Sequence, residues 1–280
     1  MRGKGDTAVG RGSNLQHTLI TAFCGKQSTK HHFLGYGSNM SSKVLSGRRQ
    51  VFPKRSVPVI VHGYQLTYDM PGFPYLEPGF GTIQPVTPTN GSRHTTDGAP
   101  LLDSADGRMP DCQVGSPLHC VAHLITQREM DHIVNTEGGN GSPDFGYQLI
   151  KVPCQTYEGE RITGVSLIDT DNCITGYHPS VRYQKIIVDG AVEHGLAPEY
   201  IERLRMVTPY RAKTIGQRIG KWVFLAIALP LTLPVLVCSI SALVFKTKVP
   251  WVVSVYGEWV KRLLWLLHDY IFASVFGKGC

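Results

Sequence analysis

The segment HHFLGYGSNMSS, residues 31–42, combines residue types that suit the binding of an anion or a carbonyl oxygen. Gly35 and Gly37 flank an aromatic residue, and Ser38 and Asn39 follow directly. Because glycine has no Cβ, the backbone can approach a ligand closely, and consecutive N–H groups in such a loop can form an anion-binding nest. The same residue types are also common in ordinary turns, so the loop alone leaves both interpretations open.

Cysteine and histidine patterns favour neither a metal site nor a disulfide framework. The seven cysteines form no C-x-x-C pair, and their odd number without regular spacing favours a reducing compartment. The eleven histidines are scattered, and we expect His31 and His32 to lie on a surface arm and His119 and His123 on a strand. A nucleophilic pair of Cys120 with His123 is an alternative that the sequence leaves open. We expect no metal and no cofactor.

The net charge of +7 is unevenly distributed, with the excess of Lys and Arg near the two ends of the chain. No Lys/Arg cluster in the middle alternates with aromatic residues, so the sequence does not favour nucleic-acid binding. A basic tail beside apolar segments is more typical of contact with anionic lipid.

Four segments, in this order, resemble the γ-glutamylcyclotransferase family. FLGYGSNM resembles the family's Y-G-S-N-L loop after its first strand, with Met40 where the family often has Leu. NTEGG places Glu137 where the family has an acidic residue near a helix end. FGYQLIKV places Tyr147 at the start of a strand, and the Pro-Ser-x-x-Tyr block includes Tyr183. The resemblance covers roughly residues 33–210.

The resemblance implies a reaction in which the substrate supplies its own nucleophile. The α-amine of a γ-glutamyl amide attacks the γ-carbonyl, closes a five-membered ring and releases 5-oxoproline. This chemistry requires no catalytic Ser, Cys or metal. Glu137 is the candidate general base and then acid, a role typically worth about 10²–10⁴-fold in rate. Without the family, Glu137 is a charge at a helix end.

The resemblance also implies a pocket for the glutamyl group. Backbone N–H groups from Tyr36 to Met40 would stabilise the oxyanion and the substrate carboxylate, and the hydroxyls of Tyr147 and Tyr183 would bind the glutamyl head. The predicted substrate-binding set is Phe33, Leu34, Gly35, Tyr36, Gly37, Ser38, Asn39, Met40, Tyr147 and Tyr183.

The expected substrate is a γ-glutamyl amino acid, glutathione, or a glutathione adduct of a larger metabolite. The last follows by analogy with fungal relatives associated with sulfur-containing secondary metabolites. The competing class is a binding protein of the same fold, attached to a membrane, that has lost turnover.

Short strands interspersed with helices predict an α+β domain over residues 31–210, a compact mixed or antiparallel β-barrel with surrounding helices. The predicted strands are 58–68, 80–86, 118–125, 147–157 and 162–168. The predicted helices are 127–137, 180–195 and 197–207. A segment rich in Pro, Gly and Ser, 87–117, is expected to be a loop insertion, and residues 1–30 a flexible arm, with a transit peptide as the alternative.

The chain after residue 210 predicts membrane helices. Residues 222–245 carry no charge and are long enough to span a bilayer. Pro230 and Pro234 are tolerated in such helices. On a helical wheel the polar residues of 250–276 share one side, which predicts an amphipathic helix in the plane of the headgroups, with a second span as the alternative.

Charge around the predicted span favours a catalytic domain in the cytosol. More Lys and Arg residues precede 222–245 than follow it, and cytoplasmic flanks carry this excess. Asn39 also begins an N-glycosylation sequon, Asn-Met-Ser, and a glycan there would block the loop expected to bind substrate. The sequence leaves the oligomeric state open.

Overall fold

The computed structural model describes residues 30–86, 117–137, 148–169, 176–245, 247 and 249–280. Three expectations therefore lie wholly or almost wholly outside the described residues. These are the N-terminal arm 1–30, the loop insertion 87–117 and the position of Tyr147.

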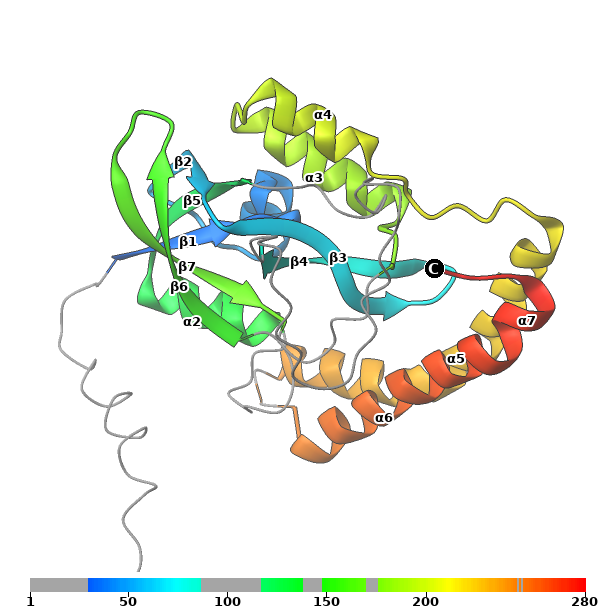
Figure 1. Ribbon diagram of the computed structural model, residues 1–280. Helices are drawn as coiled ribbons and strands as arrows, with labels where there is room; N and C mark the ends of the chain where they lie inside the picture. Colours follow the sequence, from blue (N-terminus) through cyan, green and yellow to red (C-terminus); the bar gives the residue numbers. More distant parts are fainter. Residues whose placement is uncertain (1–29, 87–116, 138–147, 170–175, 246, 248) are drawn as a thin grey trace, which may run out of the picture.

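Five strands close into a β-barrel in the order β1-β5-β2-β6-β7 (Figure 1). Their bounds are β1 Lys30–Gly35, β2 Arg55–Val61, β5 Leu118–Thr126, β6 Gln148–Thr156 and β7 Arg161–Ile168. The parallel pairing of β1 with β7, at Phe33 and Val165, closes the barrel, and the other neighbouring strands are antiparallel. The α+β class with a mixed barrel is thus confirmed.

The strand predicted over 58–68 is wrong, because the chain turns in its middle. A turn at His62 and Gly63 ends β2 and begins β3, Tyr64–Phe73. Gly63 has φ of +76°, a conformation that glycine adopts without steric cost. After the turn, β3 leaves the barrel and pairs with β4, Glu77–Pro85, as a separate two-stranded sheet.

Side-chain caps determine where the helices beside the barrel begin. Thr126 and Glu129 form a capping box at the start of α2, Gln127–Thr136. The Ser180 hydroxyl accepts a hydrogen bond from the Tyr183 N–H and so starts α3, Val181–Glu193. Helix α4, Pro198–Met206, follows with proline in its first turn.

The main core lies between the barrel and the pair α3 and α4. Val59, Val121 and Val152 contribute from the barrel, and Ile187 and Tyr200 contribute from the helices, all fully buried. Burying such side chains supplies most of the favourable free energy of folding. The site described below lies beside this packed core.

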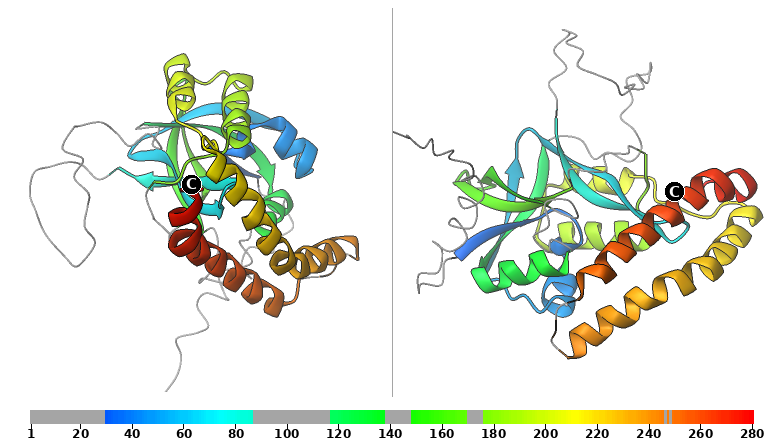
Figure 2. Two further views of the ribbon diagram at one scale, coloured as in Figure 1. Left: turned by 90° about the vertical axis from the view of Figure 1, so that its right-hand side faces the viewer. Right: turned by 90° about the horizontal axis from the view of Figure 1, so that it is seen from below.

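The C-terminal helices form a hairpin that lies against one side of the molecule (Figure 2). Helix α5, Ile215–Val244, packs along α6, Trp251–Leu267, which continues through a π-helical turn, η3, His268–Phe272, into α7, Ala273–Phe276. Among the described residues, α5 is the one helix that is long and apolar enough to cross a membrane. This statement about α5 rests on its length and its composition.

Candidate active site

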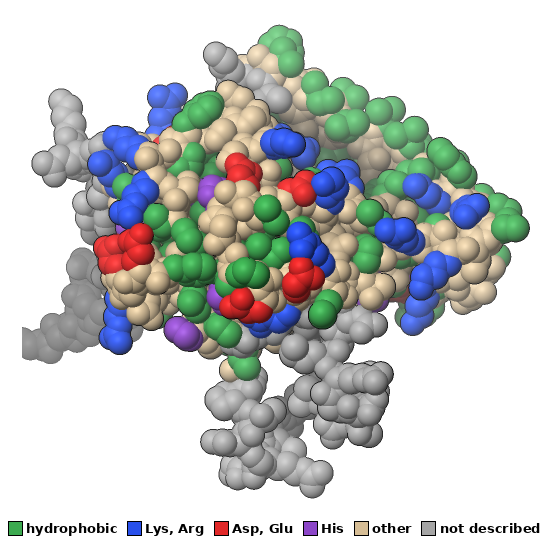
Figure 3. All heavy atoms as spheres, turned by 90° about the horizontal axis from the view of Figure 1, so that it is seen from above, with side chains coloured by type: hydrophobic (Ala, Val, Ile, Leu, Met, Phe, Trp, Pro, Cys, Tyr) green, Lys and Arg blue, Asp and Glu red, His purple; other side chains and the backbone are tan. Residues whose placement is uncertain are grey.

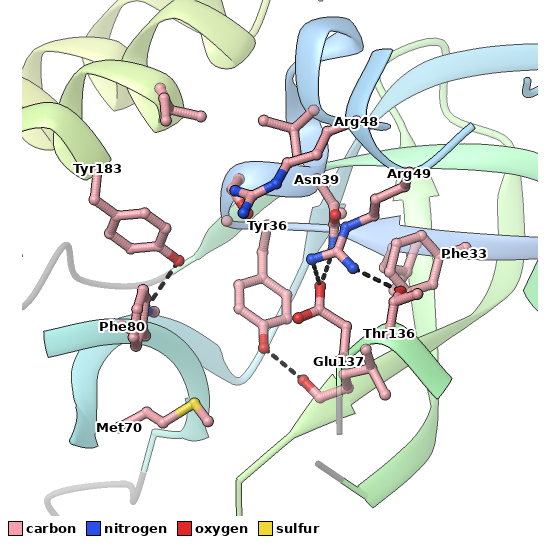
Figure 4. A pocket seen from close by; sticks show the side chains of 18 of the residues that line it. Phe33, Tyr36, Asn39, Arg48, Arg49, Met70, Phe80, Thr136, Glu137 and Tyr183 are labelled. Atoms are coloured by element: carbon pink, nitrogen blue, oxygen red, sulfur yellow. Dashed lines mark hydrogen bonds and ion pairs between the residues drawn. The ribbon is translucent and has the colours of Figure 1, made fainter. Parts of the chain in front are cut away.

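A cavity of about 240 Å³ opens where the first strand of the barrel ends (Figure 4). Its wall comes from β1 and the loop after it, from the short π-helix η2, Lys43–Arg48, from β3 and β4, from the ends of α2 and β7, and from the start of α3. This volume suits a small head group better than a large ligand. The lining residues used below are Phe33, Leu34, Gly35, Tyr36, Gly37, Ser38, Asn39, Arg48, Arg49, Glu137 and Tyr183.

The loop after β1 forms a short 3₁₀ turn, η1, Ser38–Met40. The Met40 N–H donates to the Gly37 carbonyl at 3.0 Å, and the Met40 side chain is fully buried in the core. Met40 is not one of the residues lining the cavity, so the expectation that its N–H binds substrate does not fit the structure. A residue after the turn-forming glycine naturally donates back into the turn, which removes its N–H from the loop's free donors.

Both glycines of the loop have close neighbours where a side chain would stand. A Cβ on Gly37 would lie 3.0 Å from the Tyr183 hydroxyl oxygen. A Cβ on Gly35 would lie 3.0 Å from the Asn39 carbonyl oxygen and 3.2 Å from His123 Nε2. Close approach therefore explains glycine at both positions.

His123 on β5 supports this loop from below. Its Nε2 donates to the Asn39 carbonyl at 3.1 Å, and its Nδ1 accepts from the Ser56 hydroxyl at 2.8 Å. Burial, followed by the neighbouring His194, lowers the pKa of His123 to about 3, so the ring is neutral. Both ring nitrogens are thus occupied by groups other than Cys120, whose thiol pKa burial raises well above its usual value. The Cys–His alternative therefore finds no support.

Glu137 ends α2 and turns its carboxylate into the cavity. Its N–H closes the last helical turn on the Ile133 carbonyl at 2.9 Å. Its Oε1 accepts a hydrogen bond from Asn39 Nδ2 at 2.8 Å and lies 2.5 Å from Arg49 Nη2 (Figure 4). The side chain is 17% exposed, so it remains accessible to a small ligand. One carboxylate oxygen thus carries both contacts.

Arg49 is a site residue that the sequence reasoning missed. It follows η2 directly, and its other terminal nitrogen, Nη1, donates to the Thr136 hydroxyl at 2.7 Å. The guanidinium therefore contacts two consecutive residues at the end of α2 and holds Glu137 in place. Its signal was the Arg48-Arg49 pair soon after the glycine loop, but only the fold shows that these residues reach the cavity.

Two buried tyrosines shape the opposite wall. The Tyr36 hydroxyl donates to the Leu167 carbonyl at 2.6 Å, so it anchors the loop to β7. The Tyr183 oxygen accepts from the Gly81 N–H at 3.2 Å, and the Ser38 N–H also points at it. Burial raises the pKa of both phenols, which are therefore neutral. With its oxygen accepting from the backbone, Tyr183 keeps its own proton available for a ligand.

Further cations stand around the cavity. Arg182, on the first turn of α3, pairs with Glu77 at the start of β4. Arg48 also lines the cavity and is exposed, and no ion-pair partner for it is found among the described residues. In the part of the chain that the structure describes, no group of His, Cys, Asp and Glu side chains could hold a metal ion.

Comparison with known proteins assigns the chain to a family. No family model matches the sequence. The chain is 32% identical over 256 residues to the γ-glutamyl cyclotransferase aclK of Aspergillus oryzae, a match that covers 88% of this chain and 89% of the relative. The chain belongs to the γ-glutamyl cyclotransferase family. A second relative, the γ-glutamyl cyclotransferase gliK of Claviceps purpurea, is 26% identical over 252 residues, 86% of this chain and 99% of gliK.

A solved γ-glutamyl cyclotransferase structure is similar at a TM-score of 0.49 and 20% identity, covering 66% of this chain and 92% of that one. This similarity is too distant to support an argument about the site. The enzyme class rests instead on the sequence relatives, several of which are named γ-glutamyl cyclotransferases.

The predicted residues of this γ-glutamyl cyclotransferase differ in where they lie. Residues 33–39, Glu137 and Tyr183 line one cavity, although they come from distant parts of the sequence. Met40 lies in the core instead, and Tyr147 is outside the described residues. The roles of the lining residues in binding and catalysis stay predictions.

Proposed function

We propose that this enzyme releases 5-oxoproline from a γ-glutamyl amide by intramolecular attack of the substrate's α-amine. The new C–N bond closes the five-membered ring, and the bond from the γ-carbon to the leaving nitrogen then breaks. The proton lost by the attacking amine is the proton gained by the leaving amine, so one residue can serve both steps. The observation that supports this proposal best is the Glu137 carboxylate, held in a small cavity beside the glycine loop.

Glu137 suits the proton transfer because its contacts use only one of its oxygens. Asn39 and Arg49 both approach Oε1. Within the described residues, Oε2 has no hydrogen-bond partner, so it can accept from the substrate's α-ammonium. The side chains of Arg49 and Asn39 then act as positioning groups, because each fixes the carboxylate without touching the reacting atoms.

The loop and Tyr183 would bind the remainder of the glutamyl group. Because the Ser38 N–H points at Tyr183, the N–H groups of Tyr36, Gly37 and Asn39 are the candidates for the developing oxyanion and the substrate carboxylate. Losing one such donor typically costs about 3–4 kcal/mol of barrier. The Tyr183 proton can donate to the same head group, which would favour the folded conformation needed for ring closure.

The cavity and the family both support the proposed substrate class. A γ-glutamyl amino acid, glutathione and a glutathione adduct share the glutamyl head that a cavity of about 240 Å³ can hold. Their leaving groups would extend toward the rim, where Arg48 and Arg182 lie.

We further propose that the C-terminal helices attach the enzyme to a membrane and that the catalytic domain faces the cytosol. Helix α5 is long and apolar enough to span a bilayer, and many of its large side chains are exposed. The sequon at Asn39 supports the cytosolic side, because Nδ2, the atom that would carry a glycan, donates to Glu137 and Asn39 is buried.

The proton role is tested with the full chain in detergent, given γ-glutamyl-alanine or glutathione, and with 5-oxoproline measured by chromatography. We expect Glu137→Gln to lower kcat about 10²–10⁴-fold, since the amide keeps the shape but cannot take the proton. Glu158→Gln, on the exposed turn between β6 and β7, is the matched control and should retain full activity. Activity that survives Glu137→Gln refutes the proton role, and a wild-type chain without turnover supports the binding-protein alternative.

A further inference from the structure

The end of the chain is fastened to the turn between β3 and β4. The Tyr75 N–H donates to the Gly279 carbonyl at 2.7 Å, and the Tyr75 hydroxyl donates to the Gly277 carbonyl at 2.8 Å. The Gly279 N–H in turn donates to Nε2 of the buried His268 at 2.8 Å. Three hydrogen bonds thus join four residues, and we call this contact the C-terminal clasp: Tyr75, His268, Gly277 and Gly279.

Backbone geometry shows that the clasp is tightly fitted. Tyr75 has φ of +63°, an uncommon value for a non-glycine residue, and its ring leaves no room for a Cβ on Gly279, which would lie 2.8 Å away. Trp265 of α6 adds a hydrogen bond from its Nε1 to the Gly72 carbonyl at 3.0 Å. A non-glycine residue such as Tyr75 keeps a positive φ only when the surrounding contacts fix it there.

The start of α5 lies at the same place as the end of the chain. A Cβ on Gly220 would lie 2.6 Å from the Phe276 Cβ, so α5 and α7 pack closely there. Gln217 Nε2 donates to the Lys278 carbonyl at 2.9 Å. Phe224 packs against Tyr75, with ring centroids 5.7 Å apart. Both ends of the α5–α6 hairpin are therefore held on the barrel side (Figures 1 and 2).

Beyond the clasp, the hairpin exposes an apolar surface that the described part of the chain does not cover. The part of α5 after Phe224 is about 30 Å long, close to the thickness of the hydrocarbon core. Hydrophobic side chains gather along the edge formed by these helices, with Lys and Arg beside them (Figure 3). The exposed residues include Leu229, Leu233, Leu236, Val237, Ile240, Val244, Phe245, Trp251, Val252, Val255, Tyr256 and Trp259.

We infer that the α5–α6 hairpin enters the bilayer from the barrel side and returns to it, so that Cys280 and the active-site cavity face the same compartment. This inference rests on the membrane attachment proposed above. A single crossing by α5 would leave α6 and the end of the chain on the far side, and the clasp could not form. The clasp therefore argues against a tail that ends across the membrane.

The cations at the start of α5 and one ion pair on α6 fit this arrangement. Arg218 and Lys221 lie in the first turns of α5, beside the clasp, where the headgroups of anionic lipids would attract them. On α6, Glu258 and Lys261 pair at 3.5 Å and are only about one-third exposed, which lowers the cost of placing them near the hydrocarbon. Trp251 and Trp259 are exposed on the same helix, as residues at a membrane interface often are.

The topology is tested on the full chain with one protease site placed before Met1 and another after Cys280. Sealed membrane vesicles from expressing cells are washed with alkaline carbonate and treated with the protease, with and without detergent. We expect both sites to be cut in the same vesicles without detergent. The site before Met1 reports the side on which the barrel lies and serves as the internal control.

Two other outcomes would contradict two different statements, the hairpin inference and the membrane attachment. If the first site is cut while the site after Cys280 is protected until detergent is added, α5 crosses once and the hairpin inference is wrong. If the carbonate wash releases the protein, the membrane attachment itself is wrong, and the inference fails with it. A released dimer would then show that a second copy covers the apolar surface.

Discussion

At the scale of single residues, the pair of Glu137 with Arg49 distinguishes this site from an isolated carboxylate. Two donors converge on one oxygen, and the guanidinium also contacts the Thr136 hydroxyl. An Arg with two contacts on neighbouring residues restricts a side chain more than a single ion pair does. We therefore expect Arg49 to act through the position of Glu137.

Replacing Arg49 tests this role. We expect Arg49→Met to lower kcat roughly 10- to 100-fold, because a carboxylate displaced by about 1 Å loses its alignment with the reacting nitrogen. KM should change little, since Arg49 is not proposed to bind substrate. Steady-state kinetics with γ-glutamyl-alanine separates the two constants.

Its neighbour supplies a control for the loss of one positive charge. Arg48→Met removes a cation from the same cavity wall without breaking a contact to Glu137, so kcat should stay near the wild-type value. Arg49→Lys should recover part of the loss, because it keeps the charge but not the second hydrogen bond. An equal fall in kcat for Arg48→Met and Arg49→Met would contradict a positioning role.

At the scale of elements, the site depends on how closely the loop after β1 approaches α3 and β5. Gly37 faces the Tyr183 hydroxyl from α3, while His123 from β5 holds the carbonyl of Asn39. Tyr36 ties the same loop to β7. Three elements therefore fix the loop before any ligand arrives, which is the pre-organisation that stabilisation of an oxyanion requires.

A methyl group on the loop should disturb this arrangement. We expect Gly37→Ala to reduce kcat/KM at least about 10-fold, because a Cβ 3.0 Å from the Tyr183 oxygen displaces either the loop or the tyrosine. Gly47→Ala is the matched control, since nothing lies within 4 Å of a Cβ there. Both variants should unfold near the wild-type temperature. Equal activity of the two would show that the loop tolerates the shift.

At the scale of the whole molecule, the buried neutral histidines link stability to pH. The pKa of His123 falls to about 3 and that of His119 to about 4, in both cases chiefly because of burial. In the unfolded chain both rings would protonate near pH 6.5. Between those values the unfolded state binds more protons than the folded state, so stability is fully present above about pH 6.5 and is lost as the pH falls.

Thermal unfolding measured across pH tests this link. We expect the midpoint to drop steadily below about pH 6.5, with His123 alone costing up to about 1.4 kcal/mol for each pH unit. His123→Gln keeps a donor for the Asn39 carbonyl but cannot be protonated, so its midpoint should depend less on pH. If the slope is the same in this variant, His123 does not contribute.

Much of the local structure could be predicted from the sequence because it depends on neighbouring residues. The strands 80–86, 118–125 and 162–168 and the three helices of the catalytic domain appear close to their expected bounds. The caps at Thr126 and Ser180 act within one helical turn, so a short pattern contains them. The turn at Gly63 also has a local signal, glycine between two apolar runs, but the β-branched residues on both sides predict a single strand.

The sequence by itself determined the α+β class and the apolar C-terminal segment, because hydrophobic patterns carry both, and the family follows from the relative aligned over 88% of the chain. Only the tertiary structure decided that Arg49 meets Glu137, that Met40 belongs to the core and that the chain ends against Tyr75. These contacts join residues far apart in the chain or depend on which way one side chain turns. Barrel closure and helix packing determine both, and no local pattern records them.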